Sequence, residues 1–358
     1  MDAPSLFLFA STIVVTLATG RLAPQCSIRS CHDVDQEHGD SFYLKRAHQL
    51  RRALTKPIQS RFRVVAVFLL DDKTLVFGAN DEAPPTISGS ICAERGAFLQ
   101  YRLLQYEHDK IPQIRKIYIV TDSDIPVPPG LLCREYMYGH PAVTPTTPII
   151  MQSADEASIP WVSNLQELYP YPSLYMKLSV EEQLSVGQAA ITTSAQKLVL
   201  STSDPSQQQA FSIEQVGKVL EEAQRATLED NKDGVHPIRY GAAALWVETH
   251  DEICVISASQ RKTLEYGATQ DAVSQLLSRV LLEVKHRQQS KKKNCTLLLA
   301  QVDHFGIVHP PFAAARALLV EHGFGDVQVV VPSPQSGNTG SLTIVLARHL
   351  APFVPEWK

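Results

Sequence analysis

Cysteine is scarce in this sequence, with six residues in 358, which is too few for a fold that depends on disulfide bonds. A surplus of positive charge is also absent, because 33 lysine and arginine residues face 37 aspartate and glutamate residues, and the formal net charge is −4. Strong nucleic-acid binders usually carry a basic surplus. The lysine run at residues 291–293 is therefore interpreted as a solvated loop tip, and nucleic acid is not an expected partner.

The N-terminal region lacks a hydrophobic run long enough to span a membrane. The apolar stretch at residues 6–20 (LFLFASTIVVTLATG) has 15 residues, whereas a transmembrane helix needs about 20. Its length and the small residues at 18–20 suit a secretory signal, but Asp2 and the lack of a preceding Lys or Arg do not. We expect residues 1–40 to form an N-terminal extension, with no integral membrane domain and a cytoplasmic location. The alternative is the secretory pathway or an organelle, if residues 1–20 act as a targeting segment.

The remaining composition is that of a globular protein, with 44% hydrophobic and 20% charged residues, and the length predicts two domains. In the first half, a hairpin is followed by helices and strands, expected at residues 62–70, 74–78, 92–107, 117–121, 131–138 and 148–151. The second half repeats this order at residues 240–247, 253–258, 268–284, 296–302, 311–321, 327–331 and 342–347. The repetition predicts an α/β fold with a mixed sheet, present twice in tandem at residues 41–195 and 205–358.

Two cysteine motifs in the first half carry the chemistry. Cys92 opens the sequence Cys-Ala-Glu-Arg, and Cys133 opens Cys-Arg-Glu 41 positions later, each at the predicted start of a helix. A thiolate at a helix N-terminus is favoured by the helix dipole and by unpaired backbone N–H groups. Thiolates suit Zn²⁺, so two such termini that meet would form a zinc site, and Glu94 would serve as its proton shuttle. The alternative roles are ordinary ones: small buried cysteines, and a first-turn acid that stabilises a helix.

These motifs resemble the cytidine deaminase family, whose pattern is Cys/His-Ala-Glu followed by Pro-Cys-x-x-Cys-Arg-Gln. The upstream sequence at residues 77–83 (FGANDEA) is similar to the strand of that family that ends in Asn-x-Glu. The segment at residues 164–170 is similar to one that follows the first domain in the two-domain bacterial and plant type. The likeness covers residues 45–170, and more faintly residues 238–331.

The resemblance implies a three-layer α-β-α fold and a zinc-dependent hydrolase that converts cytidine or deoxycytidine to uridine or deoxyuridine, as in pyrimidine salvage. The resemblance implies that Glu94 is the catalytic residue and that Cys92 and Cys133 are metal ligands. It implies substrate binding by Phe62, Asn80 and Glu82. Arg95 and Arg134 would tune the charge of the site. Residues 80–82 also suit an ordinary hairpin end. The two-domain relatives further imply one zinc ion per chain, in the first domain only, and a homodimer.

One position departs from the family pattern. Gly130 stands where the first Cys of Pro-Cys-x-x-Cys is expected, so only two protein ligands can be recognised. A third ligand is left unassigned, with Asp122, Asp124 and His108 open by chain position and His140 disfavoured, because it lies seven residues after Cys133.

In the pairing that we expect from the sequence, the second half keeps neither the zinc-ligand cysteines nor the catalytic Glu of the motifs. That pairing sets residues 266–269 (YGAT) against Ile-Cys-Ala-Glu and residues 311–316 (PFAAAR) against Pro-Cys-x-x-Cys-Arg, so this half should bind no metal. Three hypotheses follow: an active nucleoside deaminase, a catalytically inactive deaminase-fold protein that binds or regulates, and a deaminase of bases in RNA or DNA. The absence of a basic surplus disfavours the third.

Overall fold

The computed structural model describes residues 38–83, 89–104, 112–192, 200–201, 211–230, 233–247, 253–289, 296–333 and 341–354. The apolar N-terminal stretch, His108 and most of the expected join at residues 200–209 lie outside this part. Among the helices that the structure describes, none is both long enough and apolar enough to cross a membrane.

The first unit is built on one mixed sheet of five strands in the order β2-β1-β3-β4-β5. Its elements are α1 (Asp40–Ala53), β1 (Val64–Leu70), β2 (Leu75–Ala79), α2 (Ala93–Leu104), β3 (Ile114–Thr121), α3 (Leu131–Gly139), β4 (Ile149–Gln152), β5 (Trp161–Ser163) and α4 (Leu165–Leu168). Only the β3–β4 pairing is parallel; the others are antiparallel.

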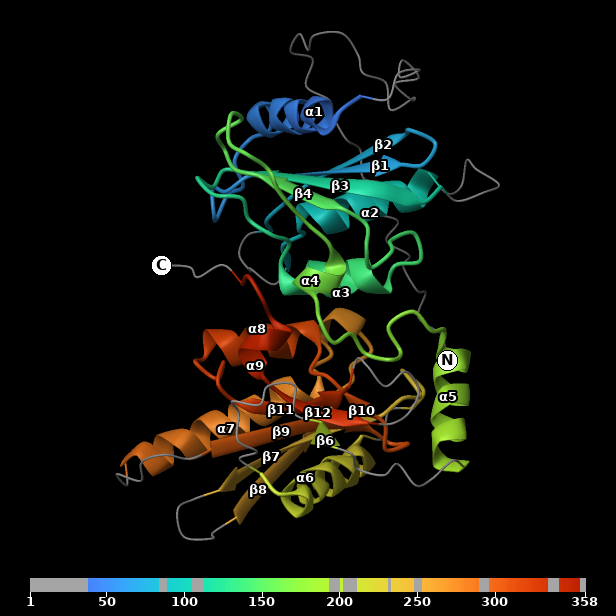
Figure 1. Ribbon diagram of the computed structural model, residues 1–358, viewed down its shortest axis with the longest axis vertical. Helices are drawn as coiled ribbons and strands as arrows, with labels where there is room; N and C mark the ends of the chain where they lie inside the picture. The colour runs from blue at the N-terminus through green and yellow to red at the C-terminus, as the bar shows by residue number, and fades with distance from the viewer. Residues whose placement is uncertain are drawn as a thin grey trace, which may run out of the picture.

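Helices cover both faces of this sheet, which explains why its central strands are continuous apolar runs rather than alternating ones. In β1, six of the seven residues are buried. Val65, Val67 and Leu69 pack under α1 on one face, while Ala66 and Phe68 pack under α2 and α3 on the other. The result is a three-layer α-β-α unit (Figure 1).

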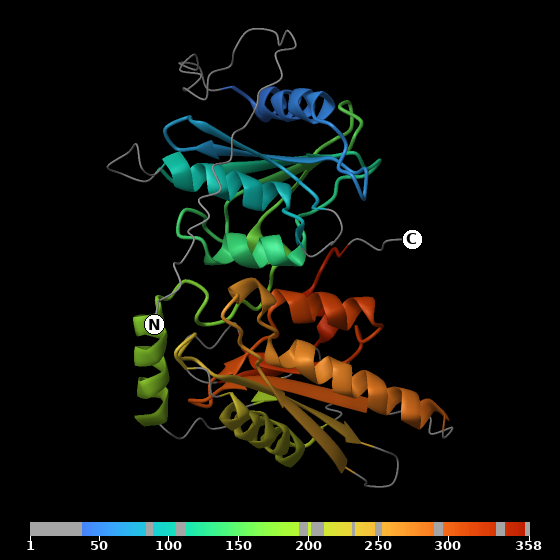
Figure 2. The same cartoon turned by 180° about the vertical axis from the view of Figure 1, so that it is seen from behind.

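The second unit repeats this arrangement. Its elements are α6 (Ile213–Ala226), the 3-10 helix η3 (Thr227–Glu229), β7 (Tyr240–Val247), β8 (Ile253–Ser259), η4 (Tyr266–Ala268), α7 (Ala272–Gln289), β9 (Thr296–Asp303), β10 (Val308–His309), α8 (Ala313–Glu321), β11 (Gln328–Pro332), β12 (Leu342–Leu346) and α9 (Ala347–Leu350). Its sheet has the order β8-β7-β9-β11-β12, extended by β6 (Leu200–Ser201) at the β12 edge and by β10 beside β9. Figure 2 shows the two units one above the other. The fold predicted from the sequence, a mixed three-layer α/β unit present twice, is confirmed.

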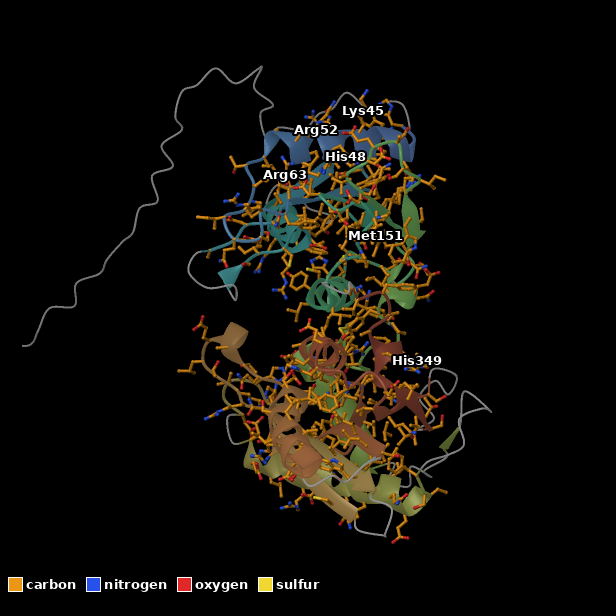
Figure 3. All side chains as sticks on the ribbon, turned by 90° about the vertical axis from the view of Figure 1, so that its left-hand side faces the viewer. Lys45, His48, Arg52, Arg63, Met151 and His349 are labelled. Atoms are coloured by element: carbon orange, nitrogen blue, oxygen red, sulfur yellow. The ribbon has the colours of Figure 1, made fainter. Side chains whose placement is uncertain are left out.

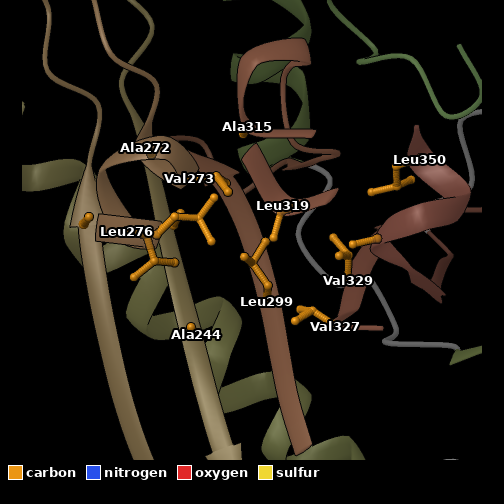
Figure 4. Packing of buried hydrophobic residues seen from close by; sticks show 14 of the residues in the cluster. Ala244, Ala272, Val273, Leu276, Leu299, Ala315, Leu319, Val327, Val329 and Leu350 are labelled. Atoms are coloured by element: carbon orange, nitrogen blue, oxygen red, sulfur yellow. The ribbon is translucent and has the colours of Figure 1, made fainter. Parts of the chain in front are cut away.

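The core of the second unit follows from the same two-sided burial. Leu276 of α7 and Leu319 of α8 pack against Leu299 of β9 on one face (Figure 4). On the other face α6 covers Ala243 and Leu298. The connecting helix α5 (Val180–Thr192) also packs on this unit, since Leu184 and Ala190 contact its core.

The structure corrects the pairing expected between the halves. Residues 266–268 form the 3-10 turn η4, and α7 starts at Ala272 instead of residue 268. Isolated β-bridges join Asp81 to Ile91 in the first unit and Arg261 to Gln270 in the second. Asp271, rather than Gly267, therefore corresponds to Cys92. Asp271 accepts hydrogen bonds from the backbone and side chain of Ser274 and so caps α7, as a residue before a first helical turn is expected to do.

The two units meet through α3 and α8, and two buried arginines form the centre of the contact. Arg134 of α3 donates to the carbonyl oxygens of Pro352 and Phe353 in the second unit. Arg316 of α8 donates reciprocally to those of Pro170 and Tyr171, which follow the first unit. Each arginine contacts the segment just after the last helix of the opposite unit, so the contact is pseudo-symmetric, as in an isologous dimer.

Candidate metal centre

Cys92 and Cys133 come together because two helices on the same face of the first sheet begin beside each other. Helix α2 starts at Ala93, immediately after Cys92, and α3 starts at Leu131, which places Cys133 in its first turn. Gly78 of β2 allows α2 to approach the sheet closely, because a Cβ there would lie 2.1 Å from the carbonyl oxygen of Ala93. The close approach fixes the start of α2 over the end of the hairpin.

The ligand atoms of Cys92, Glu94 and Cys133 lie within 4.8 Å of one another, one from each residue. Among the described residues, no other group of three His, Cys, Asp or Glu side chains meets this condition. Cys92 is exposed, whereas Glu94 and Cys133 are 4% and 1% exposed, so the group has one open side and a buried base. Sulfur and carboxylate donors are the ligands that Zn²⁺ takes in proteins, so the residues present fit this metal.

The electrostatics of the group separate the two thiols. Contact with Cys133 lowers the pKa of Cys92, and contact with Cys92, together with burial, raises the pKa of Cys133. Cys92 is therefore the thiol that ionises first. Burial raises the pKa of Glu94, although the charges of Arg95 and Arg134 act in the opposite direction.

The expected vacancy at the third ligand position is visible as open space. Gly130 is the N-cap of α3 with extended φ and ψ of −60° and 154°, and a Cβ built on it would meet nothing within 4 Å. The backbone at Gly130 therefore has an ordinary conformation that any residue can adopt.

The alternative third ligands that the structure describes are engaged elsewhere or lie outside the group. Asp122 forms ion pairs with Arg51 at 2.8 Å and with Arg63 at 2.9 Å, and Figure 3 shows Arg63 near α1. The His140 ring packs against the Phe98 ring in a tilted arrangement, with centroids 4.5 Å apart. Burial lowers the pKa of His140 to about 4. Neither these two residues nor Asp124 belongs to the three-residue group.

The predicted substrate residues lie at the end of the β1–β2 hairpin. Asn80 accepts from the Val64 backbone at 2.7 Å and donates to the Phe62 carbonyl at 2.8 Å, so its amide fixes the hairpin end. Glu82 accepts through Oε2 from the backbone N–H groups of residues 59 and 60, each at 2.8 Å. Because Asp81 forms an isolated β-bridge with Ile91, this hairpin end lies directly beside the residue that precedes Cys92. Their role toward a substrate stays a prediction.

The two predicted charge-tuning arginines differ in their surroundings. Arg134 is fully buried and donates to the Pro129 and Leu168 carbonyl oxygens, so it also holds the turn that leads into Gly130. Burial lowers the pKa of Arg134 to about 10, against the opposing charges of Glu94 and Cys133. The charge of Arg95 acts on Cys92, Glu94 and Cys133, and its buried Nε has no hydrogen-bond partner among the described residues.

The sequence did not reveal the role of Glu135 between the units. Its Oε1 accepts from the Tyr169 hydroxyl at 2.6 Å and from the backbone N–H of Ala313 at 3.0 Å. A carboxylate of the first unit thus caps α8 of the second. Its position directly after Cys-Arg was the only local signal, and the contact spans 178 residues.

The fold and the donor group define an α/β protein with a tandem repeat and, among the described residues, one group of side chains that could hold a metal. No family model matches the chain, and no curated protein matches it. Among solved structures, a cytidine deaminase from Burkholderia pseudomallei is 20% identical, with 37% of this chain and 98% of that chain covered at a TM-score of 0.31. A cytidine deaminase from Mycobacterium tuberculosis is 20% identical, with 38% of this chain and 94% of that chain covered at a TM-score of 0.29. One from Mycobacterium leprae is 21% identical, with 37% of this chain and 99% of that chain covered at a TM-score of 0.29.

Proposed function

We propose that the first unit holds one zinc ion between Cys92 and Cys133 and hydrolyses cytidine or deoxycytidine to uridine or deoxyuridine and ammonia. The observation that carries this proposal is the convergence of both sulfurs and the Glu94 carboxylate within 4.8 Å. When bound, zinc would supply a Lewis acid that activates water for attack on the base.

Glu94 is proposed to move the protons of the reaction. Its carboxylate would take a proton from the attacking water and deliver it to N3 of the pyrimidine, and it would then assist the departure of ammonia from C4. The burial that raises its pKa supports this role, because a general acid–base group works best with a pKa near the working pH. The same burial keeps bulk water from the carboxylate.

The ribose is proposed to bind at the hairpin end beside the metal centre. Glu82 accepts from the backbone N–H groups of residues 59 and 60, which hold its carboxylate at the hairpin end, and this carboxylate is the proposed acceptor for a ribose hydroxyl. Phe62 and Asn80 precede and follow the same hairpin, and they are proposed to line the site of the base and the sugar.

The chain is further proposed to act as a homodimer through the outer surface of α2 and α3. Large apolar side chains are exposed there: Leu99 at 56%, Leu103 at 67%, Leu132 at 46% and Tyr136 at 48%. The two helices are adjacent, since the Phe98 and Tyr136 rings lie 5.1 Å apart. Adjacent exposed apolar residues of this kind mark interaction surfaces, and a second copy is the proposed partner.

Gly130 favours a second candidate, a deaminase-fold protein that binds nucleosides or regulates a partner without turnover. With Gly130 at the third position, zinc would have only the two thiolates and the Glu94 carboxylate. This set holds zinc less firmly than the usual three protein ligands, which leave the general base free. The test that separates the two candidates is whether Glu94 performs chemistry.

Turnover in a Glu94→Gln variant tests the proposal. Zinc-loaded wild-type protein should release uridine and ammonia from cytidine, and Glu94→Gln should reduce kcat by about 10²-fold or more. Glu181→Gln is the matched control, because Glu181 is also a first-turn acid but is exposed. No uridine from zinc-loaded wild type would support the inactive candidate, and equal measurable rates for Glu94→Gln and wild type would contradict the role proposed for Glu94.

A further inference from the structure

The second unit contains a cavity of about 370 Å³ beside the start of α8. This volume falls in the range of small-molecule sites in proteins. Three parts of the chain form its walls: Tyr240, Gln260 and Phe312 belong to the second unit, Ser173 to the segment between the units, and Glu135 to the first unit.

The cavity occupies the place in the second unit that the metal centre occupies in the first. Gln260 directly follows β8, as Asn80 directly follows β2. Phe312 is the N-cap of α8 with φ and ψ of −71° and 166°, close to the values of Gly130 at the N-cap of α3. The duplicated fold has therefore retained the depression where the first unit places its thiols.

The chemistry of the retained cavity has changed from metal ligation to aromatic packing. The Phe312 ring meets the Tyr240 ring edge to face, with centroids 5.1 Å apart and an interplanar angle of 90°. Ala315 stands at the position equivalent to Cys133, and Ala315 has no ligand atom. Aromatic and apolar walls of this kind accept a flat ring by stacking and edge contacts.

A buried polar network holds one wall in place. Ser173 Oγ lies 2.9 Å from His309 Nδ1, and His309 Nε2 lies 3.2 Å from Asp303 Oδ2. The Tyr175 hydroxyl donates to the same Asp303 oxygen at 2.7 Å. His309 is fully buried and does not line the cavity, so it could not donate a proton to a molecule bound there. The network fixes residues 173–175 against the second unit, which preorganises the wall.

The polar groups of the cavity select for an uncharged ligand that carries hydrogen-bond donors. Gln260 Oε1 is buried and has no donor among the described residues, although buried acceptors are normally paired. Glu135 uses Oε1 for both of its contacts, so Oε2 remains for a ligand. The cation in the wall, Lys262, lies 2.9 Å from Asp230 and is compensated by it. Burial lowers the pKa of His236, which disfavours its charged form. A phosphate would therefore lose its hydration without gaining an uncompensated cation.

We propose that this cavity binds an uncharged nucleoside or nucleobase without reacting with it, as a second, metal-free site on the chain. The aromatic wall formed by Phe312 and Tyr240 would contact the ring, and Gln260 and Glu135 would accept from its N–H or O–H groups. Because the cavity is shared by both units and the connecting segment, occupancy would stabilise their contact.

Calorimetric titration of the full-length protein tests the site, with uridine and adenosine as probes. The Glu94→Gln variant is used so that the first site cannot turn over a substrate. One binding equivalent should be lost or weakened at least tenfold by Gln260→Leu, which removes the acceptor, and by Val235→Trp, which fills the cavity from its wall. The monophosphates UMP and AMP should bind this site at least tenfold more weakly than the nucleosides.

The inference is overturned if neither probe binds, or if both variants are folded by circular dichroism and bind the probes as their parent does. The test is independent of the proposed activity. If the chain has no deaminase turnover, uridine or adenosine should still bind in the second unit. If the first unit is active and only the second site is absent, Gln260→Leu in the wild-type background should deaminate cytidine at the normal rate. In that case the Gln260→Leu change should also leave binding of the probes unaltered.

Discussion

Gly130 is the residue that sets the first site apart from the three-cysteine pattern. It caps α3 in the conformation that Phe312 adopts at the equivalent cap of α8, so glycine is not needed there for backbone geometry. The backbone freedom of Gly130 therefore does not explain its presence. What it changes is the donor set, because Cys92 and Cys133 would hold a metal without a third cysteine, while Glu94 serves as the proposed proton carrier.

A Gly130→Cys substitution should convert the site to three thiols. The new Cβ meets nothing within 4 Å, so the side chain enters without a clash, and the expected gain in zinc affinity is about tenfold or more. Competition with a chromophoric chelator measures it. Gly130→Ala is the matched control and should leave the affinity unchanged. An affinity for Gly130→Cys equal to that of wild type would show that residue 130 does not face the metal.

At the scale of elements, α3 and α8 carry the junction between the units. Both are nine-residue helices, and each contributes one fully buried arginine whose guanidinium donates only to backbone carbonyl oxygens in the contacts described. The guanidinium of Arg316 also lies 4.0 Å from the centroid of the Tyr169 ring. Five donors in a rigid planar fork suit such convergent carbonyl groups, which a lysine could not satisfy.

Arg316→Met should destabilise the protein by at least about 3 kcal/mol, because several buried carbonyl oxygens would lose their donor. Urea unfolding followed by circular dichroism measures the change. The control is Arg348→Met: Arg348 is an exposed arginine paired with Asp326, and its replacement should cost less than about 1 kcal/mol. Equal losses for the two variants would contradict the role given to Arg316.

Elements with a strong pattern could be predicted, and contacts that depend on tertiary structure could not. Strand β7 has the predicted bounds, because its apolar run is unbroken. The start of α7 was misplaced: residues 266–269 read like a degraded Cys-Ala-Glu, while the real cap is Asp271, which is recognised only through its contact with Ser274. The polar network from Ser173 to His309 spans 136 residues, so no local pattern could indicate it. The Cys92, Glu94 and Cys133 group was predicted because each residue sits in a helix-start motif.

At the scale of the whole molecule, two copies of one fold carry different groups at the equivalent position. The first keeps a thiol and carboxylate group beside a hairpin end, and the second keeps an aromatic cavity at the equivalent place. The two are joined by reciprocal arginine contacts that resemble a dimer interface within one chain. Such a junction leaves the outer faces of α2 and α3 available for a second chain.

The proposed homodimer predicts a dimeric mass for the wild type and a monomeric mass for a Leu99→Lys/Leu103→Lys double variant, because charged side chains would replace exposed apolar ones on α2. Light scattering coupled to size-exclusion chromatography measures the mass. Leu264→Lys is the control, since Leu264 is 89% exposed on the second unit. A wild-type monomer, or a double variant that remains dimeric, would remove this surface from the proposal.

The zinc content of the purified chain tests the central claim most directly. After zinc loading and removal of free metal, elemental analysis should find one zinc per chain in the wild type, none in Cys133→Ser, and one in Asp271→Asn, the change at the equivalent of Cys92 in the second unit. Wild-type protein that retains no zinc, or zinc that is retained equally by Cys133→Ser, would contradict a metal centre on the first of two duplicated units.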